Sequence, residues 1–158
     1  MPSPIHIRRG TPADASTIAS FQEAMAAETE DKPLDAATVL AGVQGLLERP
    51  AHGFYLVAER SGTTAGSLMI TPEWSDWRGG FFWWIQSVYV APDHRRTGVY
   101  RALYDQVQAY AQEADDVIGI RLYVERENEG AREVYRRLGM EETPYRLYES
   151  SLPRSSTA

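Results

Sequence analysis

Four basic side chains crowd around a glycine in a chain that is otherwise acidic. Within eight residues stand His94, Arg95, Arg96 and Arg101, with Gly98 between them. The apolar run before them is typical of a buried strand, and the stripe after them has the spacing of a helix. A strand that enters a helix through a basic, glycine-containing turn brings free backbone N–H groups and the positive end of the helix dipole together. That arrangement can bind a diphosphate, to which arginine adds charge-assisted hydrogen bonds.

The same pattern also fits an ordinary strand-to-helix connection with a solvated basic turn, and the motif alone does not choose between them. A second segment, residues 128–140, begins with Asn128 and continues with a helical stripe that includes Tyr135. From periodicity alone Tyr135 is a core residue, because Val134 and Leu138 lie on the same face.

Taken together, the two segments resemble the signatures of the GNAT superfamily of N-acetyltransferases. The run from Arg95 to Tyr100 is similar to the family's (Gln/Arg)-x-x-Gly-x-(Gly/Ala) loop, and Val88-Tyr89-Val90-Ala91-Pro92 is similar to the strand that leads into it. The run from Asn128 to Met140 resembles the family's Asn-x-x-Ala-x-x-x-Tyr-x-x-x-Gly-(Phe/Met) helix. The likeness covers nearly the whole chain. It departs at Tyr100, where the family has a small residue, so this ring either crowds the phosphates or turns away.

The resemblance implies that acetyl-CoA is the co-substrate and that its acetyl group passes directly to a primary amine of a small molecule or peptide. Backbone amides from Arg96 to Arg101 would hold the diphosphate, and the backbone of Val88 and Val90 would pair with the pantetheine arm like an added strand. Asn128 would bond that arm or hold the neighbouring strand. The cofactor-binding residues implied are Val88, Tyr89, Val90, Arg95, Arg96, Thr97, Gly98, Val99, Tyr100, Arg101 and Asn128.

With the resemblance, Tyr135 becomes the expected catalytic acid. A phenol with an ordinary pKa of about 10 is protonated at neutral pH and can protonate the departing sulfur. No general base stands out. The acidic candidates, directly or through water, are Glu28, Glu30, Glu73 and Asp76, each of which also fits a solvated surface carboxylate.

The amine site is expected near the aromatic cluster that precedes the basic turn. All four tryptophans lie between Trp74 and Trp84, and aromatic rings with carboxylates can cage a cationic amine. A homodimer interface or core packing explains the same rings. Gln86 shares the alternation of Val88 and Val90 along the expected strand. The candidate substrate-binding residues are Glu28, Trp74, Trp84 and Gln86.

The remaining pattern predicts one mixed α/β (α+β) domain over residues 1–152 and a disordered tail over 153–158. Helix starts are expected at Thr11-Pro12 and Asp35, and a loop is expected over Pro72–Gly80. Strands are expected around Ile5, over Phe54–Glu59, Ala65–Thr71, Phe81–Val90 and Ile118–Val124, and finally over Tyr145–Tyr148. Helices are expected from Val99 to Ala114 and from about Asn128 to Gly139. The family resemblance implies a central, mixed, mostly antiparallel sheet flanked by helices.

Composition narrows the classes of function. The chain has 158 residues, a formal net charge of −6 and no cysteine, which argues against nucleic-acid binding and excludes thiolate sites and disulfides. No run of residues is long and apolar enough for a membrane span, and no metal site is expected because the three histidines are scattered. A cytoplasmic location is the expectation. Two other readings stay open: a non-catalytic acyl-CoA-binding regulatory module, and an acidic interaction domain whose basic loop binds carboxylates or phosphorylated partners.

Overall fold

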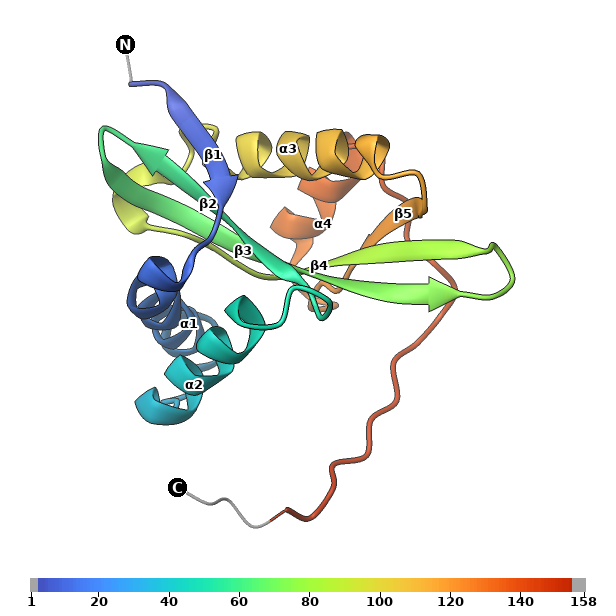
Figure 1. Cartoon of the computed structure of the whole chain (residues 1–158), viewed down its shortest axis with the longest axis horizontal. Coiled ribbons are helices and arrows are strands. Elements are labelled where there is room, and N and C mark those ends of the chain that lie inside the picture. Colours follow the sequence, from blue (N-terminus) through green and yellow to red (C-terminus); the bar gives the residue numbers. More distant parts are fainter. Residues whose placement is uncertain (1–2, 155–158) are drawn as a thin grey trace. The chain divides into compact units, whose positions relative to one another are not determined.

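The structure, a computed structural model, describes residues 3–154 and has a mixed α/β fold (Figure 1). The elements, in chain order, are β1 (Ile5–Arg9), α1 (Ala15–Glu30), α2 (Ala36–Leu47), β2 (Phe54–Arg60), β3 (Thr63–Ser75), β4 (Gly80–Val90), α3 (Val99–Glu113), β5 (Val117–Leu122) and α4 (Glu129–Arg137). The strands form one sheet in the order β1-β2-β3-β4-β5. The first three pairings are antiparallel and β4–β5 is parallel. The expected mixed, mostly antiparallel sheet flanked by helices is therefore confirmed.

The chain divides into two compact units. The first runs to Leu122 and holds the sheet with α1, α2 and α3, and the second begins at Tyr123 and holds α4. A single domain over residues 1–152 stays a prediction. Of the expected tail, Pro153 and Arg154 have no regular secondary structure, and residues 155–158 lie outside the described part of the chain.

Apolar side chains cover both faces of the sheet in the first unit. On one face Tyr55 and Val57 pack against Ile18 of α1 and Val43 of α2. The alternate residues of the same strands are equally buried on the other face, which Figure 1 shows covered by α3. The fully buried side chains there include Leu56, Leu68, Ile70, Leu103 and Val107. The strands between the two layers are consequently held from both sides.

Local signals in the sequence set the helix starts. Asp14 accepts a hydrogen bond from the Thr11 N–H (2.7 Å), and Pro12 opens a short 3-10 helix that leads into α1. Asp35 accepts from the N–H of Thr38 (3.0 Å) at the start of α2. Both predicted starts are confirmed, because each cap is satisfied by a residue only three positions away.

Two expectations about irregular and regular segments are wrong. The loop expected over Pro72–Gly80 is mostly strand, since β3 runs to Ser75 and β4 begins at Gly80. Pro72 is tolerated because β2 pairs with β3 only as far as Ile70, so the missing N–H disrupts no ladder on that side. The strand expected over Tyr145–Tyr148 is absent from the described residues. Alternating side chains make a strand only when another strand supplies hydrogen bonds, and this segment has no such partner within residues 3–154.

An ionic cluster joins the start of α1 to the edge of the sheet. Arg8 of β1 donates to both carboxylate oxygens of Asp14 at 2.8 Å, and its Nε donates to Glu59 of β2. The hydrogen bonds from Arg8 hold the pKa of Asp14 below its usual value. Since Asp14 is buried, this fork fixes where the chain leaves β1 and enters α1.

We expect Asp14→Asn to lower the free energy of unfolding at pH 7 by about 1–2 kcal/mol, because the buried side of the Arg8 guanidinium loses its charged acceptor. The lowered pKa means that ionised Asp14 stabilises the fold above the ordinary Asp pKa and that this contribution disappears as the pH falls through the folded value. Urea unfolding at several pH values should therefore show the variant and the wild type converging in acid. Asp35→Asn is the control, since asparagine caps a helix about as well as aspartate. Equal losses for the two variants at neutral pH would contradict the assignment.

Candidate active site

Strand β4 continues beyond the end of its neighbour β5. Their parallel pairing runs from Phe81↔Val117 to Ile85↔Leu122, where β5 ends, whereas β4 continues to Val90. Within the described residues, positions 86–90 of β4 therefore have a strand partner only on the β3 side. An unpaired strand edge can accept an extended ligand through backbone hydrogen bonds.

A β-bulge interrupts β4 at the start of this open edge. Gln86 pairs with Met69 but Tyr89 pairs with Ser67, so two residues of β4 face one residue of β3. Ser87 adopts a left-handed conformation (φ 54°) at this point. The extra residue reverses the alternation of side chains. Gln86 consequently shares a sheet face with Tyr89, and the expectation that it shares one with Val90 is wrong.

A hollow of about 640 Å³ lies beside the open edge, within the first unit. Its walls come from the end of α1, the end of β4 and the beginning of the basic turn. The lining residues are Met25, Glu28, Thr29, Val88, Tyr89, Val90 and Arg95. Five of the residues proposed from the sequence, namely Glu28, Val88, Tyr89, Val90 and Arg95, are therefore gathered around one space.

Glu28 connects the two sides of this hollow. Its Oε2 accepts from the Tyr89 hydroxyl at 2.7 Å, and its Oε1 accepts from Arg95 at 2.9 Å. Arg95 also donates through Nε to the carbonyl of Val90 at 2.9 Å. Arg95 thus fixes both the carboxylate and the final peptide group of the open edge.

These contacts set the protonation states. The hydrogen bonds from Tyr89 and Arg95 lower the pKa of Glu28, so this carboxylate is ionised at neutral pH and is a weak base. Burial and the hydrogen bond to Glu28 raise the pKa of Tyr89. The hollow therefore presents an ionised carboxylate that is paired with the Arg95 guanidinium, and a neutral phenol, at neutral pH.

The basic turn has the backbone geometry of an anion site. Arg96 (φ 61°) and Gly98 (φ 88°) are both left-handed, and α3 starts at Gly98 without a capping side chain. The first intrahelical bond is from Ala102 to Gly98 (3.0 Å), so the N–H groups of the first turn have no intrahelical acceptor. A Cβ placed on Gly98 would meet no atom within 4 Å, which means that the approach to these groups is open.

The first-turn residues of α3 use their side chains locally. Arg101 pairs with Asp105 one turn along the helix (3.1 Å). The Tyr100 ring lies 6.3 Å from that of Tyr104, between ring centroids, and its hydroxyl is buried. In the first turn of α3, the backbone N–H groups are therefore better suited than the side chains to hold a phosphate.

The candidate acceptor residues separate by sheet face. Trp84 and Gln86 lie on the face that carries Tyr89, and Gln86 donates to the Thr71 hydroxyl at 2.6 Å. Trp74 lies on the opposite face, where its ring packs against Phe81 with a centroid distance of 4.9 Å. The structure therefore brings Glu28, Trp84 and Gln86 to one face and leaves Trp74 on the other.

One acidic residue of the aromatic cluster is already neutralised. Glu73 accepts from Arg121 at 2.7 Å, and the Arg121 guanidinium lies 3.6 Å from the Phe82 ring centroid. The Arg121 guanidinium therefore already fills the position next to this ring and carboxylate that a cationic ligand would need.

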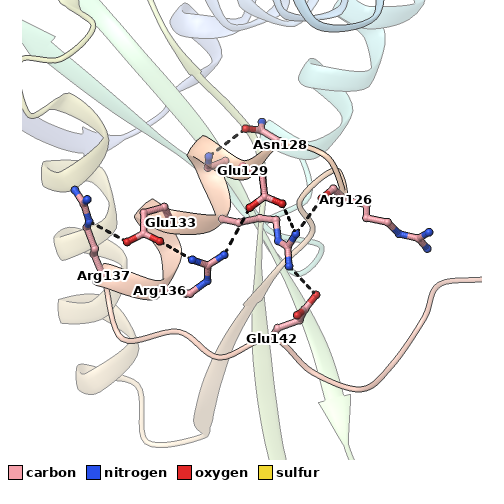
Figure 2. Close-up of polar contacts among 9 residues, drawn as sticks. Arg126, Asn128, Glu129, Glu133, Arg136, Arg137 and Glu142 are labelled. Carbon is pink, nitrogen blue, oxygen red and sulfur yellow. Dashed lines mark hydrogen bonds and ion pairs between the residues drawn. The ribbon is translucent and has the colours of Figure 1, made fainter.

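The second unit carries the other two proposed residues. Asn128 caps α4, its Oδ1 accepting from the Ala131 N–H at 3.1 Å, and Tyr135 lies half-buried on the same helix. Figure 2 shows charged side chains of α4 joined in ion pairs, among them Arg136–Glu133 (2.5 Å) and Arg137–Glu133 (3.3 Å). The helix that presents Tyr135 is thus stabilised by its own cap and by salt bridges between successive turns.

Sequence reasoning missed the partners that shape the hollow. Neither the Glu28 contacts nor the hydrogen bond from Arg60 to the Thr97 hydroxyl (2.8 Å) has a local signal, because the bonded residues are 37 to 67 positions apart. The bulge at Ser87 also has no composition signal. No cluster of metal-ligating side chains occurs within residues 3–154. In the same described part of the chain, no helix is both long and apolar enough to span a membrane.

A family model describes most of the chain. Residues 16–140 match the acetyltransferase (GNAT) family. No curated protein sequence matches.

Solved structures match over nearly the full length. A possible acetyltransferase of Clostridium difficile 630 is 39% identical, with a TM-score of 0.89, covering 95% of this chain and 99% of the other. A predicted acetyltransferase of Clostridium acetobutylicum, crystallised with acetyl-CoA, is 18% identical, with a TM-score of 0.77 and coverage of 93% and 96%. AAC(6')-Iy, in complex with the bisubstrate analogue CoA-S-monomethyl-acetylneamine, is also 18% identical, with a TM-score of 0.76 and coverage of 95% and 99%. At these lower identities the likeness shows the fold.

Glu28→Gln should lower the pKa of Tyr89, because a neutral amide no longer opposes ionisation of the phenol, while burial keeps the pKa above its ordinary value. Titration of ¹³C-labelled tyrosine by NMR would measure the shift. Glu30→Gln removes the same charge two residues along without touching Tyr89 and should leave that titration unchanged. An unaltered Tyr89 midpoint in Glu28→Gln would show that the hydrogen bond does not persist in solution.

Proposed function

The chain belongs to the acetyltransferase (GNAT) family, and on that premise we propose that it is an N-acetyltransferase. It moves the acetyl group of acetyl-CoA directly to a primary amine of a small molecule or a peptide. The observation that carries the proposal is the open edge of β4, which leads without interruption into the basic turn and the first turn of α3. One strand thereby offers an edge for an amide-containing arm and, at its end, a cradle for a diphosphate.

The residues present fit acetyl-CoA. The arm of the molecule contains amide groups, which suit the unpaired backbone of Val88 and Val90. The carbonyl of Val90 already accepts from Arg95, so the other polar groups of the edge are the ones left for the arm. The diphosphate suits the first-turn N–H groups of α3, where Gly98 leaves open space and the helix dipole favours negative charge.

Transfer forms a bond between the amine nitrogen and the acetyl carbon and breaks the carbon–sulfur bond. The nitrogen gives up a proton, and the sulfur gains one. Tyr135 is the proposed donor of the proton to sulfur, because its phenol suits a general acid at neutral pH. The proton from nitrogen leaves through water, since the lowered pKa of Glu28 makes that carboxylate a weak acceptor.

Glu28 is proposed to attract the amine in its cationic form. The bound ammonium passes one proton to water before the neutral nitrogen attacks, and the nitrogen loses a second proton as the amide forms. The Glu28 carboxylate is ionised at neutral pH, lines the hollow beside the β4 edge and is paired with Arg95, so the amine would share the carboxylate with that guanidinium. Trp84 and Gln86 lie on the same sheet face and complete the proposed acceptor surface. Trp74 remains a candidate for the part of a larger acceptor that extends beyond the strand pair β3–β4.

Release of thiol from acetyl-CoA tests the proposal. Purified protein is incubated with acetyl-CoA and a panel of polyamines, aminoglycosides, amino acids and peptides with free N-termini. Amine-dependent thiol release, with an N-acetyl product in the mass spectrum, is the expected result. CoA binding by calorimetry without thiol release from any amine would favour the non-catalytic acyl-CoA module, and absence of binding would contradict both.

Tyr135→Phe should lower kcat about 100-fold while changing the Kd of acetyl-CoA by less than about twofold, because the ring is kept and the transferable proton is lost. Steady-state kinetics and calorimetry supply the two numbers. Tyr148→Phe is the control, as the Tyr148 side chain is 93% exposed. Near-normal kcat in Tyr135→Phe would remove this residue from the mechanism.

Gly98→Ala and Gly62→Ala separate backbone strain from ligand binding. Both glycines are left-handed with empty space around the absent Cβ, so each substitution should cost about 1 kcal/mol of stability. Only Gly98→Ala should raise the KM for acetyl-CoA, about tenfold, because its methyl group stands where the diphosphate approaches. Thermal unfolding and kinetics measure the two effects. An equal KM for both variants would argue against the cradle at Gly98.

A further inference from the structure

Arg60, the last residue of β2, reaches the centre of the basic turn. Its NH1 donates to the Thr97 hydroxyl at 2.8 Å and its NH2 donates to the Thr97 carbonyl at 3.2 Å. Its Nε donates to the carbonyl of Ser3 at 3.0 Å. A single guanidinium thus spans from the N-terminal segment to a loop 37 residues further along the chain.

Thr97 is the one residue between the two left-handed positions of the turn. Arg96 and Gly98 flank it, and Arg96 has a Cβ that makes this conformation costly by about 1 kcal/mol. The Thr97 hydroxyl donates to the His94 carbonyl at 2.5 Å while it accepts from Arg60. Its donor and its acceptor are therefore both used to hold the turn in one shape.

The side-chain hydrogen bonds of Arg60 are not part of the pairing between the strands of the sheet. Arg60 pairs through its backbone with Ile5 of β1 and with Thr63 of β3, and those pairings do not involve its side chain. The half-buried side chain donates twice to Thr97 and once to the Ser3 carbonyl, so most of its hydrogen bonds go to the turn. A loop that is already in its binding conformation loses less entropy when a ligand arrives.

We propose that Arg60 is a positioning residue for the phosphate-binding turn, which it holds through Thr97 in the shape that receives the diphosphate of the acyl donor. The inference rests on the proposed function. Arg60 acts on the diphosphate end of the donor and not on the thioester, so its removal weakens acetyl-CoA binding and leaves the chemistry intact.

Two donor substrates isolate that effect. Acetyl-pantetheine has the thioester and the arm of acetyl-CoA but no diphosphate. Arg60→Met should raise the KM for acetyl-CoA about five- to tenfold and leave kcat and the KM for acetyl-pantetheine within about twofold of wild type. Arg60→Lys should fall between, because an ammonium group can still donate to Thr97 but lacks the fork.

Two matched variants test whether the change in KM is specific to Arg60 and to its contact with Thr97. Arg49→Met removes an equal charge just after α2 and should leave both KM values unchanged, since the Arg49 guanidinium donates to the Gly45 carbonyl of that helix and not to the basic turn. In a Thr97→Val background, Arg60→Met should raise the KM for acetyl-CoA by about twofold at most, because the hydroxyl contact is already lost. A parallel rise of KM for both donors, or additive effects of the two substitutions, would overturn the inference.

Hydrogen exchange of the ligand-free protein tests whether Arg60 holds the turn, and it needs no measurement of activity. Arg60→Met should speed exchange of the hydrogen-bonded amides on either side of Thr97, those of His94, Arg95 and Ala102, and leave the peptide that covers β2 unchanged. Unchanged exchange in the turn, or faster exchange throughout β2, would overturn the role of Arg60. Failure of the wild type to release thiol would contradict the proposed function alone, because the exchange result does not depend on it.

Discussion

The separation of β4 from β5 is the constraint on which the site depends. Polar backbone groups in a folded chain are normally paired, so a strand edge left open next to a hollow needs water or a ligand to satisfy it. The edge is open because β5 ends at Leu122 while β4 continues to Val90. The bulge at Ser87 then turns Tyr89 towards Glu28, which places a charge beside that edge. The open edge and the bulge together set the shape and the electrostatics of the hollow.

Local signals made most of the fold predictable from the sequence. Caps at Thr11 and Asp35 and the helical stripe after Gly98 depend on neighbours within one turn, and the structure confirms them. Strand ends were harder to predict, because a strand continues as long as a partner does. The extension of β3 through Pro72 depends on its pairing with β4, and residues 145–148 alternate without a partner in the described chain.

The candidate site, too, could be predicted only in part from the sequence. The basic turn could be located because its charge, its glycine and its flanking elements are contiguous in the sequence. The contacts of Glu28 and Arg60 could not, since they join positions far apart on different elements. One inserted residue at Ser87 was enough to reverse the expected face of Gln86. Trp74 and Trp84 are close in sequence, yet strand alternation puts them on opposite faces.

The two bonds of Arg95 have a thermodynamic consequence. One guanidinium bonds both the carboxylate of Glu28 and the carbonyl of Val90. The carboxylate and the open edge of β4 are therefore connected through Arg95. Any ligand that binds better to one arrangement of Arg95 changes the affinity of a second ligand at Glu28. Reciprocity makes the factor the same in either order of binding. Occupancies of the two ligands are therefore energetically coupled wherever Arg95 has to move.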